Sequence, residues 1–216
     1  MNEPVLTSQD QQLLDLMRER LVSSPLPGLA AQRLMAPPVR GEYSSTPLNA
    51  RRASVMVLFY PIAERLHLLY IQRTSPKRDR HAGQISFPGG SADPEDKDAA
   101  HTALRELEEE VGVPPHAVEL IGELSPLYIP VSNFLVLPFV GWVDERPDFI
   151  PQESEVARIL ELPFADFFTP HARKSGPRKI AGGMTLPDTP FWSVREEQIW
   201  GATAMMTGEL VALLTD

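Results

Sequence analysis

The sequence predicts an α/β protein, because runs typical of strands alternate with segments of helical periodicity. Residues 53–60, Ala-Ser-Val-Met-Val-Leu-Phe-Tyr, form a nearly continuous apolar run, which is typical of a strand buried on both faces. Ala99, Ala103, Leu107 and Val111 recur every four residues, which predicts a helix with one apolar stripe. Further strands are expected at 66–72, 118–124, 135–143, 156–162 and 191–194, with a hairpin at 178–186, a loop at 126–134 and a final helix from about 199 to 214.

The first fifty residues are predicted to extend the main domain. Residues 8–21 have apolar side chains at helical spacing, and residues 23–40 are rich in proline, which predicts an extended connector with one helical turn at 29–34. We therefore expect an N-terminal helix and Pro-rich extension at 1–50 and the main domain at 51–216. The apolar face of the first helix is expected to pack on its own domain or on a second subunit, as in a homodimer.

The composition limits the class of protein. Hydrophobic residues make up 43% of the 216 residues and charged residues 23%, as in an ordinary globular protein. The chain has no cysteine, so disulfides and thiolate metal sites are excluded. The net charge of −9 argues against a nucleic-acid binder. We see no signal peptide and no run of membrane-spanning length, so a cytoplasmic location without membrane partners is expected.

Three carboxylates share one side of the helix predicted at 99–111. Glu106, Glu109 and Glu110 are spaced i, i+3 and i+4, so they lie on one arc beside the apolar stripe. A solvated acidic face would normally carry lysine four residues away, and here none follows. A divalent cation would relieve the repulsion between these groups, and hard oxygen ligands predict Mg²⁺ or Mn²⁺.

The same residues resemble the box of the Nudix hydrolases. Residues 105–113, Arg-Glu-Leu-Glu-Glu-Glu-Val-Gly-Val, match the second half of that box, R-E-U-x-E-E-x-G-U with U apolar, at every fixed position. The first half, G-x5-E-x7, departs from the pattern, because Asp96 follows Gly90 after five residues and one extra residue precedes Arg105. The upstream metal carboxylate is therefore open between Glu95, Asp96 and Asp98.

The resemblance implies an α/β/α sandwich around a mixed sheet and metal-dependent hydrolysis of a phosphoanhydride. Glu106, Glu109 and Glu110 would bind the metal, with Asp96 or a neighbour assisting, and Arg105 would hold the carboxylates in place. The backbone of Gly89 and Gly90 would approach the substrate closely. The general base stays open between a glutamate of the box and Glu153 or Glu155, and a plain surface position is favoured for the last two.

A second resemblance concerns the substrate. Leu69, Arg73, Ser75, Gly83 and the run Phe87-Pro-Gly-Gly90 resemble the stretch that precedes the box in Nudix enzymes of the coenzyme A pyrophosphatase group. The loop is one residue longer here, and Asp79 stands where the second arginine is expected, between Arg78 and Arg80. Arg73, Arg78 and Arg80 are the expected substrate-binding cations.

This second resemblance implies that coenzyme A or an acyl derivative is split at its pyrophosphate into 3′,5′-ADP and a 4′-phosphopantetheine product. The alternatives are a Nudix enzyme acting on ADP-ribose or another nucleoside diphosphate derivative, and a nucleotide sensor without turnover. A Trp-Gly-x-Thr-Ala element begins at Trp200, whose side chain either walls a ligand pocket or is buried in the core.

Overall fold

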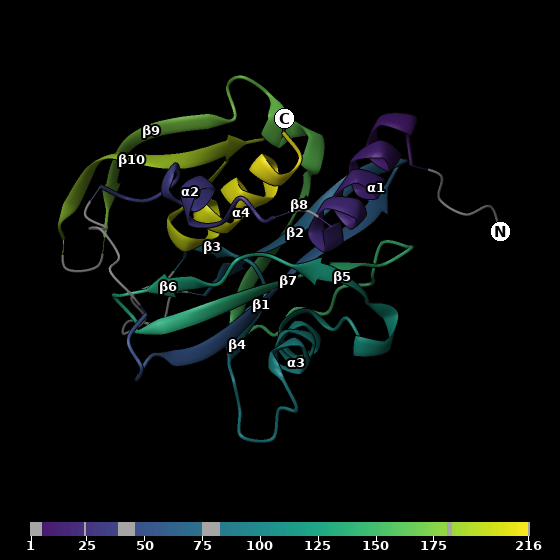
Figure 1. Ribbon diagram of the computed structural model, residues 1–216, viewed down its shortest axis with the longest axis horizontal. Coiled ribbons are helices and arrows are strands. Elements are labelled where there is room, and N and C mark those ends of the chain that lie inside the picture. The colour runs from purple at the N-terminus through teal and green to yellow at the C-terminus, as the bar shows by residue number, and fades with distance from the viewer. Residues whose placement is uncertain (1–5, 24, 39–45, 75–82, 181–182, 216) are drawn as a thin grey trace.

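The protein is an α/β/α sandwich, as the sequence predicted (Figure 1). The computed structural model describes residues 6–23, 25–38, 46–74, 83–180 and 183–215. No helix in these ranges is long and apolar enough to cross a membrane. The strands are β1 (Arg51–Ile62), β2 (Arg65–Arg73), β3 (Ile85–Ser86), β4 (Gly89–Ser91), β5 (Glu119–Glu123), β6 (Leu127–Ile129), β7 (Phe134–Trp142), β8 (Val156–Pro163), β9 (Arg173–Lys179), β10 (Thr185–Val194) and β11 (Glu197–Trp200). The helices are α1 (Ser8–Ser23), α2 (Gly28–Arg33), α3 (Ala99–Val111) and α4 (Gly201–Leu213), with 3₁₀ turns at Pro115–Ala117 and Phe164–Phe168.

Eight strands form one mixed sheet. Its central path runs β3-β2-β1-β7-β5, with β4 beside β1, β6 beside β7 and β8 beside β2. β1 and β7 are parallel, from the pair Arg51 and Phe134 to the pair Phe59 and Trp142, while the other neighbours are antiparallel. β1 and β2, which follow each other in the sequence, form an antiparallel hairpin.

The alternation of side chains along β1 divides the core into two layers. Met56, Leu58 and Tyr60 point to the layer beneath α3, whereas Val57 and Phe59 point to the layer that contains α1, α2 and α4. All five side chains are fully buried, so the continuous apolar run of the sequence reflects a strand covered on both faces.

The N-terminal extension packs on its own chain. Leu14 and Met17 of α1 belong to the same apolar cluster as Phe59. Arg65 Nε, at the start of β2, lies 2.6 Å from the carboxylate of the buried Asp10. These contacts cover the apolar face of α1 within one chain, and a homodimer stays a prediction.

Three smaller expectations are corrected by the structure. The loop expected at 126–134 contains the short strand β6. The strand expected at 191–194 is the end of one longer strand, β10, which also forms the second arm of the predicted hairpin. The final helix does not start near Ile199, because Ile199 is buried in β11 and Gly201, at φ 69°, turns the chain into α4.

A smaller antiparallel sheet, β11-β10-β9, completes the fold. Trp192 and Ile199 of this sheet join the α4 layer of the core, and the Trp192 indole donates to the carbonyl of Ala204 at 3.1 Å. At the other end of α4, the Thr203 hydroxyl donates to the carbonyl of Ile85 in β3 at 3.1 Å. α4 therefore joins the small sheet to the edge of the large one.

Candidate active site

Helix α3 is fixed at both ends and along one stripe. The Asp98 carboxylate caps its first turn by accepting from the amide of His101 at 2.8 Å, and Gly112, at φ 77°, ends it. Ala103, Leu107 and Val111 are fully buried, as the periodicity predicted, while Ala99 at the first turn is half-buried. This anchoring sets the orientation of the acidic side beside the stripe.

Gly89 and Gly90 belong to the short strand β4, which pairs with β1. A Cβ on Gly89 would lie 2.3 Å from the carbonyl oxygen of Ser54, and φ is 153°, so only glycine fits there. A Cβ on Gly90 would lie 2.5 Å from the carboxylate of Glu106. The two glycines therefore let α3 and its carboxylates approach the sheet.

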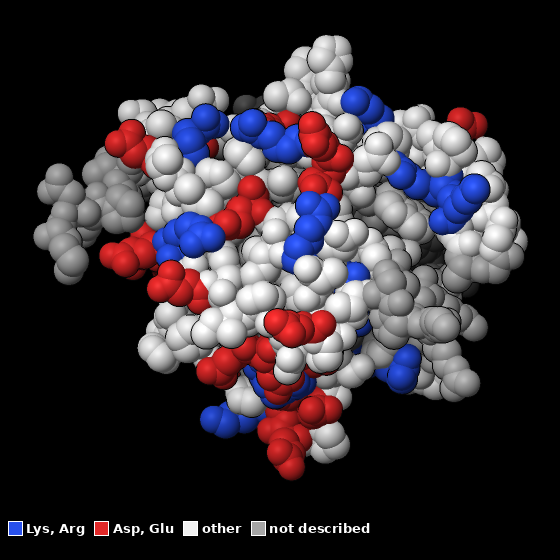
Figure 2. Space-filling model, turned by 180° about the vertical axis from the view of Figure 1, so that it is seen from behind, with Lys and Arg blue, Asp and Glu red and all other residues white. Residues whose placement is uncertain are grey.

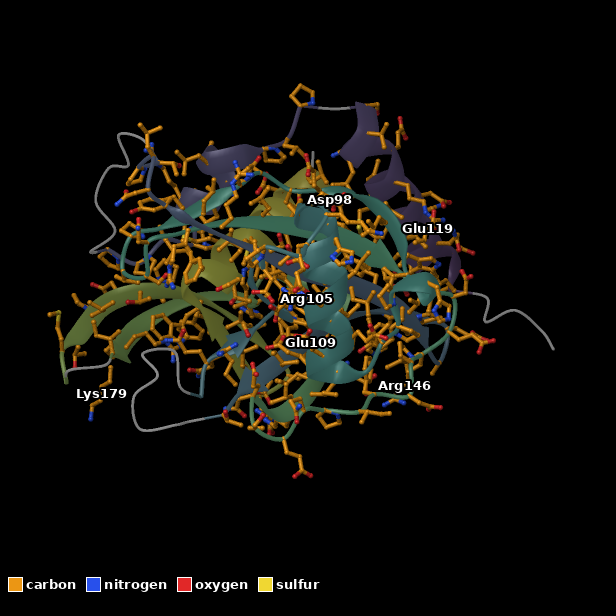
Figure 3. All side chains as sticks on the ribbon, turned by 90° about the horizontal axis from the view of Figure 1, so that it is seen from below. Asp98, Arg105, Glu109, Glu119, Arg146 and Lys179 are labelled. Atoms are coloured by element: carbon orange, nitrogen blue, oxygen red, sulfur yellow. The ribbon has the colours of Figure 1, made fainter. Side chains whose placement is uncertain are left out.

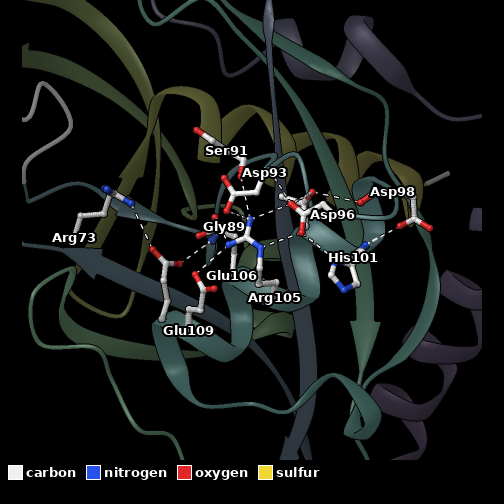
Figure 4. Close-up of polar contacts among 12 residues, drawn as sticks. Arg73, Gly89, Ser91, Asp93, Asp96, Asp98, His101, Arg105, Glu106 and Glu109 are labelled. Atoms are coloured by element: carbon white, nitrogen blue, oxygen red, sulfur yellow. Dashed lines mark hydrogen bonds and ion pairs between the residues drawn. The ribbon is translucent and has the colours of Figure 1, made fainter.

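Arg105 connects the acidic groups (Figure 4). Its guanidinium donates to Asp96 at 3.0 and 3.1 Å, to Glu106 at 3.0 Å and to Glu109 at 3.0 Å, and to the carbonyl of Ser91 at 3.1 Å. These acceptors raise the pKa of Arg105 further above its ordinary value. One cation thus holds three carboxylates and β4 together.

Asp96 has more hydrogen bonds to its carboxylate than Glu106 or Glu109 among the described residues. Besides the two bonds from Arg105, it accepts from the Asp93 amide at 2.9 Å and from the Thr102 hydroxyl at 2.8 Å. Nδ1 of His101 lies 2.9 Å from the same carboxylate. The bonds from Arg105 above all hold the pKa of Asp96 well below its usual range. The geometry therefore makes Asp96 an anchor for Arg105 and for the loop before α3.

Glu110 is buried, with 2% of its surface exposed, and it points at β4. One carboxylate oxygen accepts from the Gly89 amide at 2.8 Å. The other, Oε1, has no hydrogen-bond partner among the described residues, and Nη1 of Arg73 lies 3.6 Å away. The pKa of Glu110 is raised to about 8, above all by burial and also by the negative charges of Glu106 and Glu155, against the opposing effects of the Gly89 amide and Arg73.

Glu155 approaches the site from outside α3. Its segment is held against the helix, because the amide of Gln152 donates to the carbonyl of Glu110 at 2.9 Å. The carbonyl of Glu155 itself accepts from the amide of Thr74 at 2.8 Å, beside the end of β2. Burial raises the pKa of Glu106, and the charges of Glu109 and Glu155 add to that effect against Arg105.

Glu155 is exposed, as the favoured surface interpretation has it, and its charge nevertheless acts on Glu106 and Glu110. Figure 2 shows Asp and Glu side chains gathered at the lower edge of the molecule, around the loop that precedes α3.

The comparisons with known proteins agree with the motif. The model of the NUDIX domain matches residues 50–181. The chain belongs to the Nudix hydrolase family. A protein of Pectobacterium atrosepticum called uncharacterized Nudix hydrolase NudL is 35% identical over 166 residues, which cover 77% of this chain and 84% of the relative. Its namesake in Escherichia coli strain K12 / DH10B is 40% identical over 176 residues, covering 80% of this chain and 87% of the relative.

Solved structures that are similar to the chain have a lower sequence identity to it. The NUDIX domain of Shewanella oneidensis NrtR, complexed with ADP ribose, has 20% sequence identity and a TM-score of 0.45, over 64% of this chain and 84% of that one. An Ap4A hydrolase of C. elegans has 18% identity and a TM-score of 0.46, over 54% of this chain and 82% of that one. The chain is thus a Nudix pyrophosphohydrolase by its sequence relatives.

Nudix hydrolases generally use divalent metal ions, and the chemistry of this site fits such an ion. In the ranges that the structure covers, no three acidic or histidine side chains already converge as a metal cluster, because Glu106 and Glu109 are turned to Arg105. The unpartnered oxygen of Glu110 and the mutual repulsion of Glu106, Glu110 and Glu155 are what a divalent cation would relieve. All these donors are oxygens, which suits a hard cation.

The expected substrate-binding residues are only partly placed. Arg73 lies at the end of β2 with its guanidinium toward Glu110, and Gly89 and Gly90 lie between β1 and α3. Arg78 and Arg80 lie outside the described residues. Trp200 is half-buried at the junction of β11 and α4.

Proposed function

We propose that this Nudix enzyme hydrolyses the pyrophosphate of coenzyme A or acyl-coenzyme A, releasing 3′,5′-ADP and 4′-phosphopantetheine or its acyl derivative. The observation that carries the proposal is the position of the segment that resembles the coenzyme A group. That segment begins on β2 and ends at β4, and it contributes both the Arg73 guanidinium 3.6 Å from Glu110 and the Gly89 amide that donates to the same carboxylate.

In this proposal Glu106, Glu109 and Glu110 hold Mg²⁺ or Mn²⁺, which would neutralise the pyrophosphate and lower the pKa of a bound water. We assign Asp96, which accepts from Arg105, to positioning Arg105, and Arg105 in turn to positioning Glu106 and Glu109, and their hydrogen bonds support these roles. Arg73, Arg78 and Arg80 bind substrate phosphates, and the backbone of Gly89 and Gly90 lies against them. A homodimer and a cytoplasmic location stay predictions from the sequence.

Glu155 is the general base that we favour. Its charge acts on both Glu106 and Glu110, yet it comes from a different element and is free of the Arg105 network among the described residues. It would take the proton of the attacking water as the water oxygen bonds to phosphorus. The bond from phosphorus to the bridging oxygen then breaks, and the leaving phosphate keeps the electron pair.

Turnover of coenzyme A and of ADP-ribose, each with and without Mg²⁺ or Mn²⁺ and read by mass, tests the proposal. Metal-dependent release of 3′,5′-ADP supports it, whereas cleavage of ADP-ribose alone would keep the chemistry and refute the substrate. Cleavage of neither, with ligand bound, would favour a sensor. Glu109→Gln should abolish turnover with little loss of fold, and near-normal turnover of that variant would refute the metal site.

A further inference from the structure

Two cations on strand β9 have no carboxylate partner among the described residues. The sequence of β9, Arg-Lys-Ser-Gly-Pro-Arg-Lys, contains four cations and no acid, in a chain of net charge −9. Lys174 donates to the Ser193 hydroxyl at 3.1 Å, and Arg178 donates to the side-chain oxygen of Gln198 at 2.6 Å. Neither pairs with a carboxylate in the part of the chain that the structure describes. Such cations are suited to an anionic ligand.

Of the two cations, Arg178 gives the stronger evidence for a bound anion. Its side chain is partly buried, and its Nε is covered without any hydrogen-bond partner among the described residues. Burial lowers the pKa of its guanidinium. The guanidinium carbon lies over the ring of Phe191, 4.1 Å from the ring centre, so the cation contacts the face of an aromatic side chain. Removing a cation from water with only a neutral amide as its partner is costly, and a bound anion would offset that cost.

The strand register places these groups on one face of the small sheet. Phe191 pairs with Lys174 on one side and with Trp200 on the other, so the three side chains share one row. Arg178 is four residues from Lys174 along β9 and points to the same face. We call this set, Lys174, Arg178, Phe191 and Trp200, the outer face of the small sheet.

The outer face is the face of the small sheet that is turned away from α4. The opposite face carries Trp192 and Ile199, which join the core layer of α4. Phe191 belongs to neither core layer although only 7% of it is exposed. Figure 3, viewed from the side of α3, labels Lys179 of β9 at the left of the view and Arg105 and Glu109 of α3 at its centre.

The outer face is also connected to the pyrophosphate site through β3. β11 lies beside β3, and β3 runs within three residues into Gly89 of β4. Arg158 of β8 donates to Glu197 of β11 at 2.7 Å and to Gln72 at 2.7 Å, directly before Arg73. The small sheet, whose outer face carries these cations, is therefore connected through β3 and Arg158 to the segment that carries Arg73 and Gly89.

We propose that the outer face binds the adenosine 3′-phosphate half of the substrate, with Lys174 and Arg178 on the 3′-phosphate and Trp200 stacked on the base. The inference rests on the proposed function and deepens it. Positive charge meets the monoester phosphate, and a half-buried indole next to a guanidinium suits a planar base. The 3′-phosphate is then the feature by which the enzyme distinguishes coenzyme A from its 3′-dephospho form.

Arg178→Gln tests the phosphate contact, with Lys179→Gln as the matched control. Lys179 is the next residue of the same strand, is exposed, and points away from the outer face. We expect Arg178→Gln to raise the KM for coenzyme A about tenfold or more with kcat nearly unchanged, because a charge-assisted bond is lost. The KM for 3′-dephospho-coenzyme A should not change, and Lys179→Gln should behave like the wild type. Equal effects of Arg178→Gln on both substrates, or none, would overturn the proposal.

Binding of 3′,5′-ADP, measured by calorimetry and tryptophan fluorescence, separates this proposal from the proposed function. Trp142 and Trp192 are buried, so quenching by the ligand should come from Trp200 and vanish in Trp200→Phe. Arg178→Gln should weaken binding about tenfold or more, because the same charge-assisted bond is lost. If the wild type cleaves no coenzyme A, the proposed function fails, and the binding data still decide the subsite. Unchanged affinity and quenching in both variants would refute it.

Discussion

Replacing one of two adjacent glycines should separate catalysis from folding. In Gly90→Ala the new Cβ would lie 2.5 Å from the carboxylate of Glu106, which must move by about 1 Å to reach ordinary contact. The carboxylate is the end of a flexible side chain, so the cost in stability is about 1 kcal/mol, mostly from a weakened bond to Arg105. A displacement of about 1 Å at a reacting group can cost about 100-fold in rate.

Gly89→Ala provides the contrast. Here the Cβ would lie 2.3 Å from the carbonyl oxygen of Ser54 and 2.6 Å from the Cα of Val55, and neither backbone atom can move without breaking the pairing of β4 with β1. Together with φ of 153°, this predicts a loss of about 3 kcal/mol or more.

The assay for both glycine variants combines initial rates at saturating Mg²⁺ with thermal unfolding. Gly90→Ala should lose about 100-fold in rate. Its Tm should fall by only about 2–4 °C. Gly89→Ala should show a much larger fall in Tm. A Gly90→Ala enzyme with more than half of the wild-type rate would refute the reasoning, because Glu106 would then not need its present position.

Four further predictions concern the acidic residues Asp96, Glu155, Glu110 and Glu209. Asp96→Asn removes the main partner of Arg105 and should cost about 2–3 kcal/mol in the free energy of unfolding, measured with urea. Glu155→Gln should lower kcat about 100-fold or more while Mn²⁺ affinity, measured by calorimetry, changes little. Without metal, the pKa of Glu110 is about 8 in the folded protein and about 4.5 in the unfolded chain, so between these pH values the folded protein binds the extra proton. The free energy of unfolding, measured with urea in the presence of a chelator, should therefore fall as the pH rises from about 4.5 to about 8. Glu110→Gln should flatten that slope. The buried Glu209 accepts from the amides of Gly28 and Ser125 and from Gln32, so Glu209→Gln should lower the free energy of unfolding by about 2 kcal/mol, seen as a lower Tm, with KM unchanged.

The sequence predicts best those structural features that depend on residues close together along the chain. The stripe of α3, its three glutamates and the buried strand β1 follow from periods of a few residues, and the structure contains all of them. The sequence predicts that the final helix includes Ile199 and Trp200. In the structure these two residues form a strand, because they pair with Trp192 and Phe191. A short apolar run does not distinguish these alternatives by itself.

The composition of the site depends on contacts between distant segments. Glu155 approaches α3 because residues 150–152 return to the end of that helix, with Ile150 donating to Val111 and Gln152 to Glu110. No local pattern around Glu155 encodes that return. The extra residue before Arg105 likewise leaves the upstream carboxylate of the site open between Glu95, Asp96 and Asp98. In the structure Asp96 makes five hydrogen bonds within its own loop and helix.

The central claim, that the carboxylates of α3 bind the catalytic cation, is tested most directly by a Mn²⁺ titration of Glu106→Gln beside Glu108→Gln. Glu108 is an exposed residue of the same helix and serves as the charge-matched control. We predict that Glu106→Gln loses both tight Mn²⁺ binding and turnover, while Glu108→Gln keeps both. Equal Mn²⁺ affinity in the two variants, with turnover retained in Glu106→Gln, would contradict the account.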